Sequence, residues 1–217
     1  MADITIQGLV GQSSPRAESD GIKADLKLNR RGELCVVDFY TQMALEGRAF
    51  QVRIGTITTP AVGDVVITDT KAEMCVDAAT GTTVLPTHLH IGVNLGTGTL
   101  HEYGVKSVAA VSTSGTAFVP LPLYIGGAAS TCVARAAEAG GVVTIAELAT
   151  TTRVHWAAAN PLAVAAGHAL TNHYWEPRTP PPIVGPANVY VQVAATGTGP
   201  SYFASFEYIE LPTASVN

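Results

Sequence analysis

Charged side chains are scarce in this chain of 217 residues. Asp, Glu, Lys and Arg make up 13% of the sequence, against about 25% in an average soluble domain. Four long stretches contain none of them: residues 78–101, 107–134, 154–175 and 179–206. Because the core of a subunit interface is depleted in charge, this composition predicts a protein that assembles with other protein molecules.

Long apolar runs are missing as well. Residues 107–134 are numerous enough to span a bilayer, but they contain Pro120, Pro122, Gly126 and Gly127, which exclude a continuous apolar helix. The first residues form neither a basic nor an apolar segment, so we predict no secretory signal. We expect no membrane partner, and a protein that stays in the cytosol until it assembles.

The cysteine pattern and the charge balance exclude two further classes. Cys35, Cys75 and Cys132 are far apart and match neither a disulfide framework nor a zinc ribbon, so we interpret them as small buried residues. The chain has 12 basic and 17 acidic residues, and its densest basic spot is the pair Arg30 and Arg31. Nucleic-acid binders normally carry a basic patch or stripe, so we expect no direct contact with nucleic acid.

Period-two alternation is the main pattern that the sequence does contain. In residues 48–54, Phe50, Val52 and Ile54 fall on one face and Gln51 and Arg53 on the other, as in a half-buried strand. Similar runs follow at residues 62–67, 72–76, 88–93, 105–111, 117–125, 131–136, 142–148, 153–157, 188–194 and 202–211. Turn residues separate these runs, which predicts an antiparallel β-sandwich. A jelly roll is the expected architecture, and an immunoglobulin-like sandwich is the alternative.

Two regions depart from this pattern. Residues 1–47 hold much of the charge, and we interpret them as an extended N-terminal arm. The arm contains a β-hairpin at residues 22–28 and 33–39 and a helical turn that ends at Gly47. Residues 48–217 then form one jelly-roll-like body. Residues 160–186 are rich in Ala and Pro, and we expect an ordered connection there rather than a strand.

The pair His88 and His90 is the strongest candidate for chemistry. Alternation places both imidazoles on one face of a strand, and two imidazoles on one face can chelate a metal if a neighbouring strand supplies a third ligand. The spacing resembles the first motif of the cupins, which implies a metal-dependent enzyme. However, the positions where that motif has its carboxylate hold Val93, Asn94 and Leu95. We expect no bound metal, and a cupin-like enzyme stays open as an alternative.

Other catalytic patterns are missing. The sequence has no Gly-x-Ser-x-Gly elbow and no glycine-rich phosphate motif, and its acidic residues are too dispersed for a glycosidase pair. His155 and His173 remain as residues that folding could bring to a Ser or Cys. We therefore predict no enzymatic activity, no catalytic residue and no cofactor.

Aromatic residues gather towards the end of the chain, at Tyr174, Trp175, Tyr190, Tyr202, Phe203, Phe206 and Tyr208. Alternation in the last strand divides them between a core face and an outward face that suits a subunit contact. A carbohydrate or receptor platform is the alternative. Tyr174 and Trp175 lie in the long connection, where large aromatic side chains are candidates for interface hot spots.

Both ends of the chain resemble a loose group of structural proteins of tailed bacteriophages. The likeness covers about the first forty and the last fifteen residues. It rests on residues 4–11, on the polar stretch with Glu18, Ser19 and Asp20, and on the closing stretch 203–212. The resemblance implies a capsid decoration or minor capsid protein with a β-sandwich body, trimeric in many members and without enzymatic residues.

We therefore expect a component of a phage virion that is assembled in the host cytoplasm. Its expected partners are copies of itself, as a homotrimer or a higher assembly, and the major capsid protein or other virion proteins. The alternative is a tail-fibre or receptor-binding protein. The arm would add strands to exposed sheet edges of neighbouring subunits. The expected contact residues are Ile4, Ile6, Leu9 and Val10 in the arm, and Tyr174 and Trp175 in the long connection.

Overall fold

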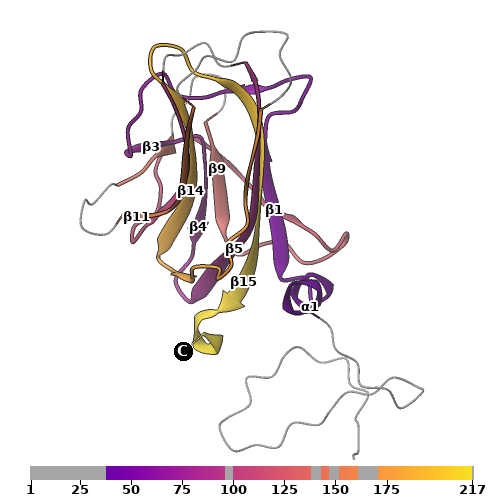
Figure 1. The fold of residues 1–217 in the computed structure, drawn as a ribbon. Coiled ribbons are helices and arrows are strands. Elements are labelled where there is room, and N and C mark those ends of the chain that lie inside the picture. Colours follow the sequence, from indigo (N-terminus) through magenta and orange to yellow (C-terminus); the bar gives the residue numbers. More distant parts are fainter. Residues whose placement is uncertain (1–37, 96–99, 138–142, 147–151, 161–170, 217) are drawn as a thin grey trace, which may run out of the picture.

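Two antiparallel sheets stack face to face in the computed structural model of the chain (Figure 1). The structure describes residues 38–95, 100–137, 143–146, 152–160 and 171–216. The predicted β-sandwich is thus confirmed. No helix in this part of the chain is both long and apolar enough to cross a membrane.

The first sheet is built on two long strands, β5 (Thr82–Leu95) and β15 (Ser201–Pro212), which pair along the whole of β15. On one side it is extended by β12 (Thr171–Trp175), and on the other by β1 (Ala49–Ile54) and β8 (Leu121–Pro122). Two short strands complete it: β13 (Ile183–Val184) pairs with β5, and β2 (Ala61–Val62) pairs with β15.

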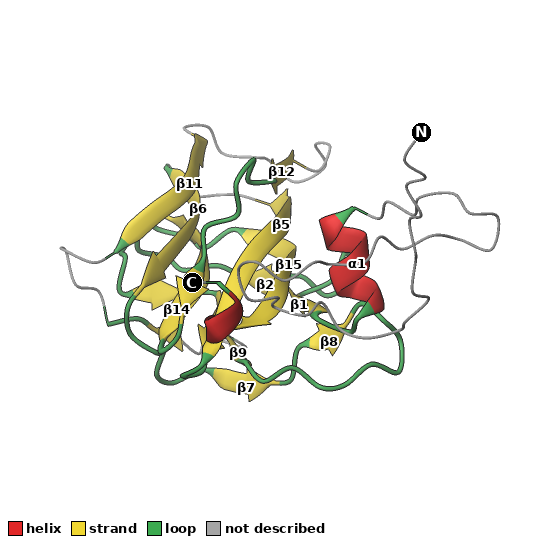
Figure 2. Ribbon diagram, turned by 90° about the horizontal axis from the view of Figure 1, so that it is seen from below, coloured by secondary structure: helices red, strands yellow, loops and turns green. Residues whose placement is uncertain are grey.

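The second sheet runs in the order β11 (Arg153–Asn160), β6 (His101–Val108), β14 (Ala187–Ala195), β4 (Met74–Ala78), β9 (Val133–Ala136) and β7 (Thr116–Phe118). A separate two-stranded sheet is formed by β3 (Lys71–Ala72) and β10 (Val143–Thr144). Figure 2, turned so that the molecule is seen from below, shows the layers beside each other.

The chain passes between the two sheets in the manner of a jelly roll. Strands β1, β5, β12 and β15 belong to the first sheet, and β4, β6, β11 and β14 to the second. Among these eight strands, every successive connection except that from β6 to β11 crosses from one sheet to the other. The first and the last of them, β1 and β15, lie side by side. This connectivity is that of the expected jelly roll.

Alternation along the strands separates the core from the surface as the sequence predicts. Leu89, Ile91 and Val93 of β5 are completely buried. His88 and His90, which alternate with them, face the other side of the sheet. The inward residues of β15 and β1, the next two strands in the sheet, are also buried: Phe50, Val52, Ile54, Tyr202, Ala204, Phe206 and Tyr208. Because a slip of one residue would turn all of these side chains to solvent, their burial fixes the register of the sheet.

Several expected boundaries are wrong. Strand β5 is longer than the predicted 88–93 and includes Pro86. This proline lies beside the register shift between Glu207 and Tyr208 of β15. A strand tolerates proline at such an irregular position. The expected connection 160–186 contains the strand β12, because its residues pair with the side of β5 that faces away from β15. Conversely, most of the expected strand 62–67 does not form. In this region only Ala61–Val62 is a strand.

Helix α1 (Phe39–Leu45) closes one end of the first sheet. The Asp38 carboxylate caps it by accepting hydrogen bonds from the backbone N–H groups of Tyr40 (2.9 Å) and Thr41 (3.1 Å). The helix ends before Gly47, whose φ of +70° favours glycine, so the expected helical turn is confirmed.

Met43 of α1 packs against Ala49 and Ile209. Helix α1 and the C-terminal 3₁₀ turn Thr213–Ser215 therefore lie at the same end of the sandwich (Figure 1). The expected hairpin lies outside the described residues, apart from residues 38 and 39.

A second layer covers part of the outer face of the second sheet. Residues 64–72, which we call the covering segment, end in β3, and β3 pairs with β10. Ala72, Val143 and Ile145 of this layer pack on outward side chains of the sheet, among them Cys75 and Tyr190. Cys75 and Cys132 are buried free thiols, as expected, and Cys35 lies outside the described residues.

Glu73 connects the covering segment to the core. Its buried carboxylate accepts hydrogen bonds from the backbone N–H groups of Val193 (2.6 Å) and Asp64 (3.1 Å). Burial raises the pKa of Glu73 to about 8, although the two N–H donors oppose this effect. The folded protein therefore holds a proton on Glu73 in a pH range where the unfolded chain, with a pKa near 4.5, has released it.

The difference between the pKa of Glu73 in the folded protein and in the unfolded chain predicts that the folded state loses stability as the pH rises from about 4.5 to about 8. The loss approaches about 1.4 kcal/mol per pH unit within this range. Glu73→Gln removes the titrating group and one hydrogen-bond acceptor. At acid pH the free energy of unfolding of this variant should therefore be lower than that of the wild type, but it should not fall in this way as the pH rises. Urea unfolding of both proteins between pH 5 and pH 9 measures the difference, and parallel pH profiles would contradict the assignment.

Candidate functional site

Much of the outer surface of the first sheet has no covering layer among the described residues. Helix α1 covers one end of this surface through Met43, Ala49 and Ile209. We call the rest the open face. It consists of the outward residues of β1, β5, β12 and β15: Gln51, Arg53, His88, His90, Gly92, Asn172, Tyr174, Phe203, Ser205 and Glu207. All of them except Gly92 are half-buried or exposed.

Three aromatic side chains pack together at the centre of the open face. The ring of His90 stacks on Tyr174 of β12, with ring centroids 4.7 Å apart and an interplanar angle of 9°. On its other side it meets the ring of Phe203 edge-on at 5.5 Å. Phe203 lies over Gly92, where an added Cβ would stand 2.2 Å from the ring. The backbone of Gly92 is not left-handed, so the glycine is needed here only for the space it leaves.

Polar contacts tie the rest of the open face together. His90 Nε2 lies 3.0 Å from Asn172 Oδ1 on the neighbouring strand. Gln51 donates a hydrogen bond from Nε2 to Glu207 Oε1 at 3.0 Å. These cross-strand contacts hold the side chains in one arrangement, and a rigid surface loses little entropy when it binds a partner.

The structure separates the two aromatic residues that the sequence places together. Tyr174 is 59% exposed on the open face, whereas Trp175 is 8% exposed and belongs to the core of the sandwich. Both lie in β12, where successive side chains point to opposite faces. Trp175 therefore has little surface left to offer to a partner. Ile4, Ile6, Leu9 and Val10, the expected contact residues of the arm, lie outside the described residues.

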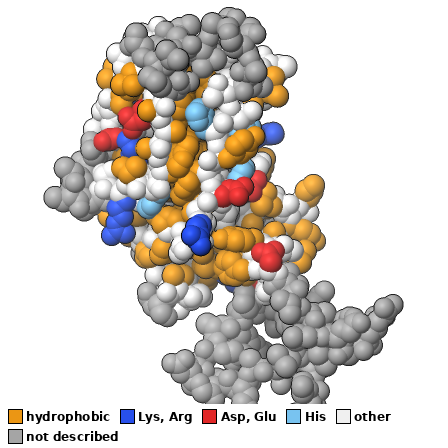
Figure 3. All heavy atoms as spheres, viewed as in Figure 1, with side chains coloured by type: hydrophobic (Ala, Val, Ile, Leu, Met, Phe, Trp, Pro, Cys, Tyr) orange, Lys and Arg blue, Asp and Glu red, His pale blue; other side chains and the backbone are white. Residues whose placement is uncertain are grey.

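A second exposed surface adjoins β1 and was not singled out by sequence reasoning. Residues 119–125, which we call the apolar loop, carry large exposed side chains, and Ile125 is 94% exposed. The others are Val119, Leu121, Leu123 and Tyr124. On the side of the molecule seen in Figure 3, few charged side chains interrupt the hydrophobic and uncharged ones. The signal in the sequence was the charge-free stretch 107–134, which contains this loop.

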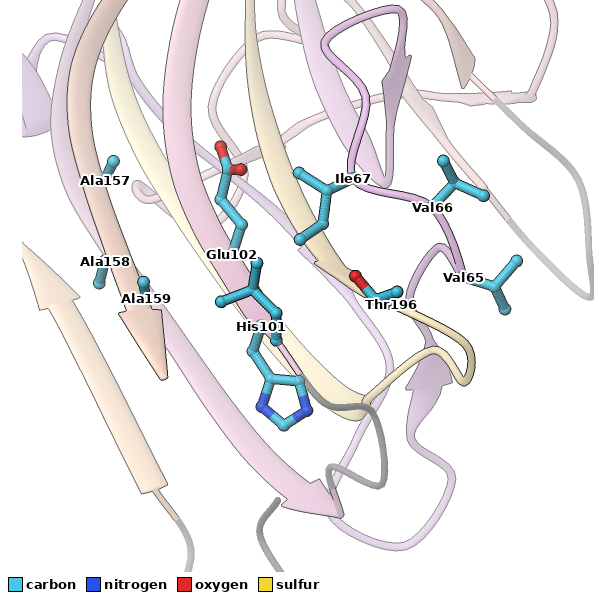
Figure 4. A pocket seen from close by; sticks show the side chains of 10 residues that line it. Val65, Val66, Ile67, His101, Glu102, Ala157, Ala158, Ala159 and Thr196 are labelled. Carbon is cyan, nitrogen blue, oxygen red and sulfur yellow. The ribbon is translucent and has the colours of Figure 1, made fainter. Parts of the chain in front are cut away.

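Two grooves accompany these surfaces. The larger, about 1180 Å³, runs beside β1, β2 and the start of the apolar loop, and Arg53, Lys71 and Asp64 are among its polar lining residues. The smaller, about 530 Å³, lies on the second sheet. In Figure 4, Ala157, Ala158 and Ala159 form one wall of the smaller groove, residues 65–67 form the other, and Glu102 lies between them.

The histidines do not form a recognisable catalytic centre in the part of the chain that the structure describes. His88 and His90 share the open face, as expected, but no group of three or more His, Cys, Asp or Glu side chains within residues 38–95, 100–137, 143–146, 152–160 and 171–216 could hold a metal. His155 does meet a serine, with Nε2 2.8 Å from Ser107 Oγ. Ser107, near the end of β6, is only 5% exposed, which leaves a substrate little access to its hydroxyl.

Comparison of the chain with protein-family models, curated proteins and solved structures gives no match.

The contact between Phe203 and Gly92 predicts the outcome of a double-mutant cycle. Gly92→Ala should reduce the free energy of unfolding by about 1–3 kcal/mol, because the new methyl group overlaps the ring. In a Phe203→Ala background the same change should cost much less. Urea unfolding of the four proteins measures the coupling. An equal cost in both backgrounds would show that the ring does not lie on Gly92.

Proposed function

We propose that this chain is a structural component of a bacteriophage virion, a capsid decoration or minor capsid protein that stabilises the shell through contacts between subunits. The apolar loop is the observation that carries the proposal, because an isoleucine that is 94% exposed stabilises an isolated folded chain very little. Exposed apolar side chains grouped in this way mark interaction surfaces. The surrounding sequence has no charged residue from 107 to 134, as in the core of an interface.

The apolar loop is held in place by the body, which favours a binding role. Its backbone joins the first sheet through β8 and through a hydrogen bond from the N–H of Leu123 to the carbonyl oxygen of Ala49 (2.9 Å). Beyond the loop, the carboxylate of Glu210 accepts bonds from the backbone N–H (3.1 Å) and the hydroxyl (2.9 Å) of Thr131. A loop tied to the sheet at residues 121–123, with a second anchor at Thr131 beyond it, presents its apolar groups with a reduced loss of entropy on binding.

The edge of β1 offers a place for the arm of a neighbouring subunit. Among the described strands, β8 pairs only with Phe50 and Gln51, so residues 52–54 of β1 have no strand on that side. The larger groove runs along this free edge. An extended segment can pair with such an edge through main-chain hydrogen bonds. We propose that the arm, with Ile4, Ile6, Leu9 and Val10, binds neighbouring subunits in this way.

The proposal predicts a stable assembly in solution, a trimer or a larger form. Ile125→Asp should raise the concentration needed for half-assembly by at least about tenfold, because a charge would have to be buried in the interface. Light scattering on the purified proteins over a range of concentrations measures the mass of each form.

Val184→Asp is the matched control. Val184 is an exposed apolar residue of β13, on the opposite side of the first sheet from β8, so this variant should assemble like the wild type. A wild-type protein that stays monomeric at high concentration would contradict the proposed function, and equal assembly of both variants would contradict the role of the apolar loop.

A receptor-binding role is the second candidate, and the cluster of Tyr174, His90 and Phe203 favours it, because exposed aromatic residues are enriched where proteins bind partners. In this case Tyr174→Ala should abolish binding of the labelled protein to host cells and leave the assembled mass unchanged. If Tyr174→Ala instead lowers the mass, the open face is a subunit contact. Trp175 is unsuitable for this test because its substitution would open the core.

A further inference from the structure

A buried polar cluster ties the covering segment to the second sheet. Lys106 of β6 is 4% exposed and its ammonium group has three partners. Nζ lies 2.9 Å from Glu102 Oε1, 2.7 Å from Gln192 Oε1, and in direct contact with Oδ1 of Asp69 in the covering segment. One amine and two carboxyl groups thus meet at one point on the outer face of the sheet.

The backbone explains why these groups meet. Glu102, Gly104 and Lys106 project from the same face of β6, and Gly104 has no side chain to separate the other two. The Lys106 side chain lies along the strand, so that an added Cβ at Gly104 would be 3.5 Å from Lys106 Cε. Gln192 stands opposite Gly104 on β14 and completes the site.

Two hydrogen bonds hold the backbone of the covering segment above this amine. Gln192 Nε2 donates to the carbonyl oxygen of Thr68, and the hydroxyl of Tyr190 donates to that of Asp69 at 3.4 Å. Reacting groups that are held in contact behave as if present at very high concentration. The Asp69 side chain is 39% exposed, which leaves a path for a small leaving molecule.

The resting state of the amine is set by its neighbours. Burial lowers the pKa of Lys106, but the hydrogen bonds and charges of Asp69 and Glu102 outweigh it and the net direction is upward. The amine is therefore an ammonium ion at neutral pH. It becomes a nucleophile only when a base removes a proton, and Glu102 is already hydrogen-bonded to it.

We propose that Lys106 and Asp69 condense into an amide that links the covering segment covalently to the second sheet. Glu102 accepts a proton from the ammonium group, and Nζ attacks Cγ of Asp69. Glu102 returns that proton to the oxygen that will depart, and then carries a second proton from the nitrogen to the same oxygen. The C–N bond forms as the bond from Cγ to this oxygen breaks, and the oxygen leaves as water. Ammonium and carboxylate become an amide and one water molecule, so no oxidant, activating group or cofactor is required.

The product fits the site. An amide keeps one N–H on the former Nζ, and Gln192 Oε1 at 2.7 Å is placed to accept it. The reaction also removes two opposite charges from a site where the amine is shielded from water, and charge is costly to keep in such places. The link would fasten the covering segment independently of any partner protein, so this inference does not depend on the proposed function.

Intact mass spectrometry of the purified wild-type chain tests the proposal. The expected mass is that of the sequence less one water molecule. After trypsin digestion, residues 54–71 should be joined to a peptide of residues 72–135 in which Lys106 is not cleaved. A wild-type chain at its full sequence mass would overturn the proposal, and so would a water loss that maps to other residues.

Two variants identify the roles. Lys106→Arg keeps the positive charge and its ion pairs but lacks a nucleophilic amine, so it should fold with its full mass. An aspartate that cyclises with its own backbone also loses one water molecule, but this reaction would persist in Lys106→Arg. The variant therefore separates such cyclisation from condensation with Lys106. Glu102→Gln keeps the size of the side chain but removes the carboxylate that accepts the proton. This variant should also retain its full mass. Water loss in Glu102→Gln would overturn the role of Glu102, and water loss in Lys106→Arg would overturn the link.

Discussion

The antiparallel pairing of β5 with β15 is the interaction on which the rest of the structure depends. It joins residues 82–95 to residues 201–212 and forms the middle of the first sheet, with β12 on one side and β1 on the other. The inward side chains of both strands build the core, and their outward side chains build most of the open face. Because the two strands are so far apart in sequence, this pairing depends on non-local contacts, which are typical of slowly folding β-sandwiches.

The two sheets differ in how much of their outer surface is covered by other described residues. Part of the second sheet is shielded by the covering segment, which has its own small core and is anchored by Glu73 and Lys106. Among the described residues, the outer surface of the first sheet is shielded only at the end where α1 packs. Polar and aromatic side chains on the open face, together with the apolar loop beside β1, therefore form the described surface where we propose that other subunits bind.

The strands whose two faces meet different environments could be predicted from sequence. In β1 and β15, solvent on one side and core on the other impose a strict alternation, and the pattern of Phe50, Val52 and Ile54 reflects it. Strand β12 has weak local signals, because β5 supplies the partner that stabilises it. One available signal was missed: adjacent residues of a strand face opposite ways, so Tyr174 and Trp175 could not both be contact residues there. The cluster around Lys106 could not be predicted, because it joins Asp69 and Gln192 from distant parts of the chain.

Helix α1 and the 3₁₀ turn at Thr213–Ser215 lie at the same end of the sandwich, because Met43 of the helix packs beside Ile209 near the end of the last strand. This arrangement gives the sandwich a polarity. A protein fused after residue 216 would be displayed from the pole where α1 packs.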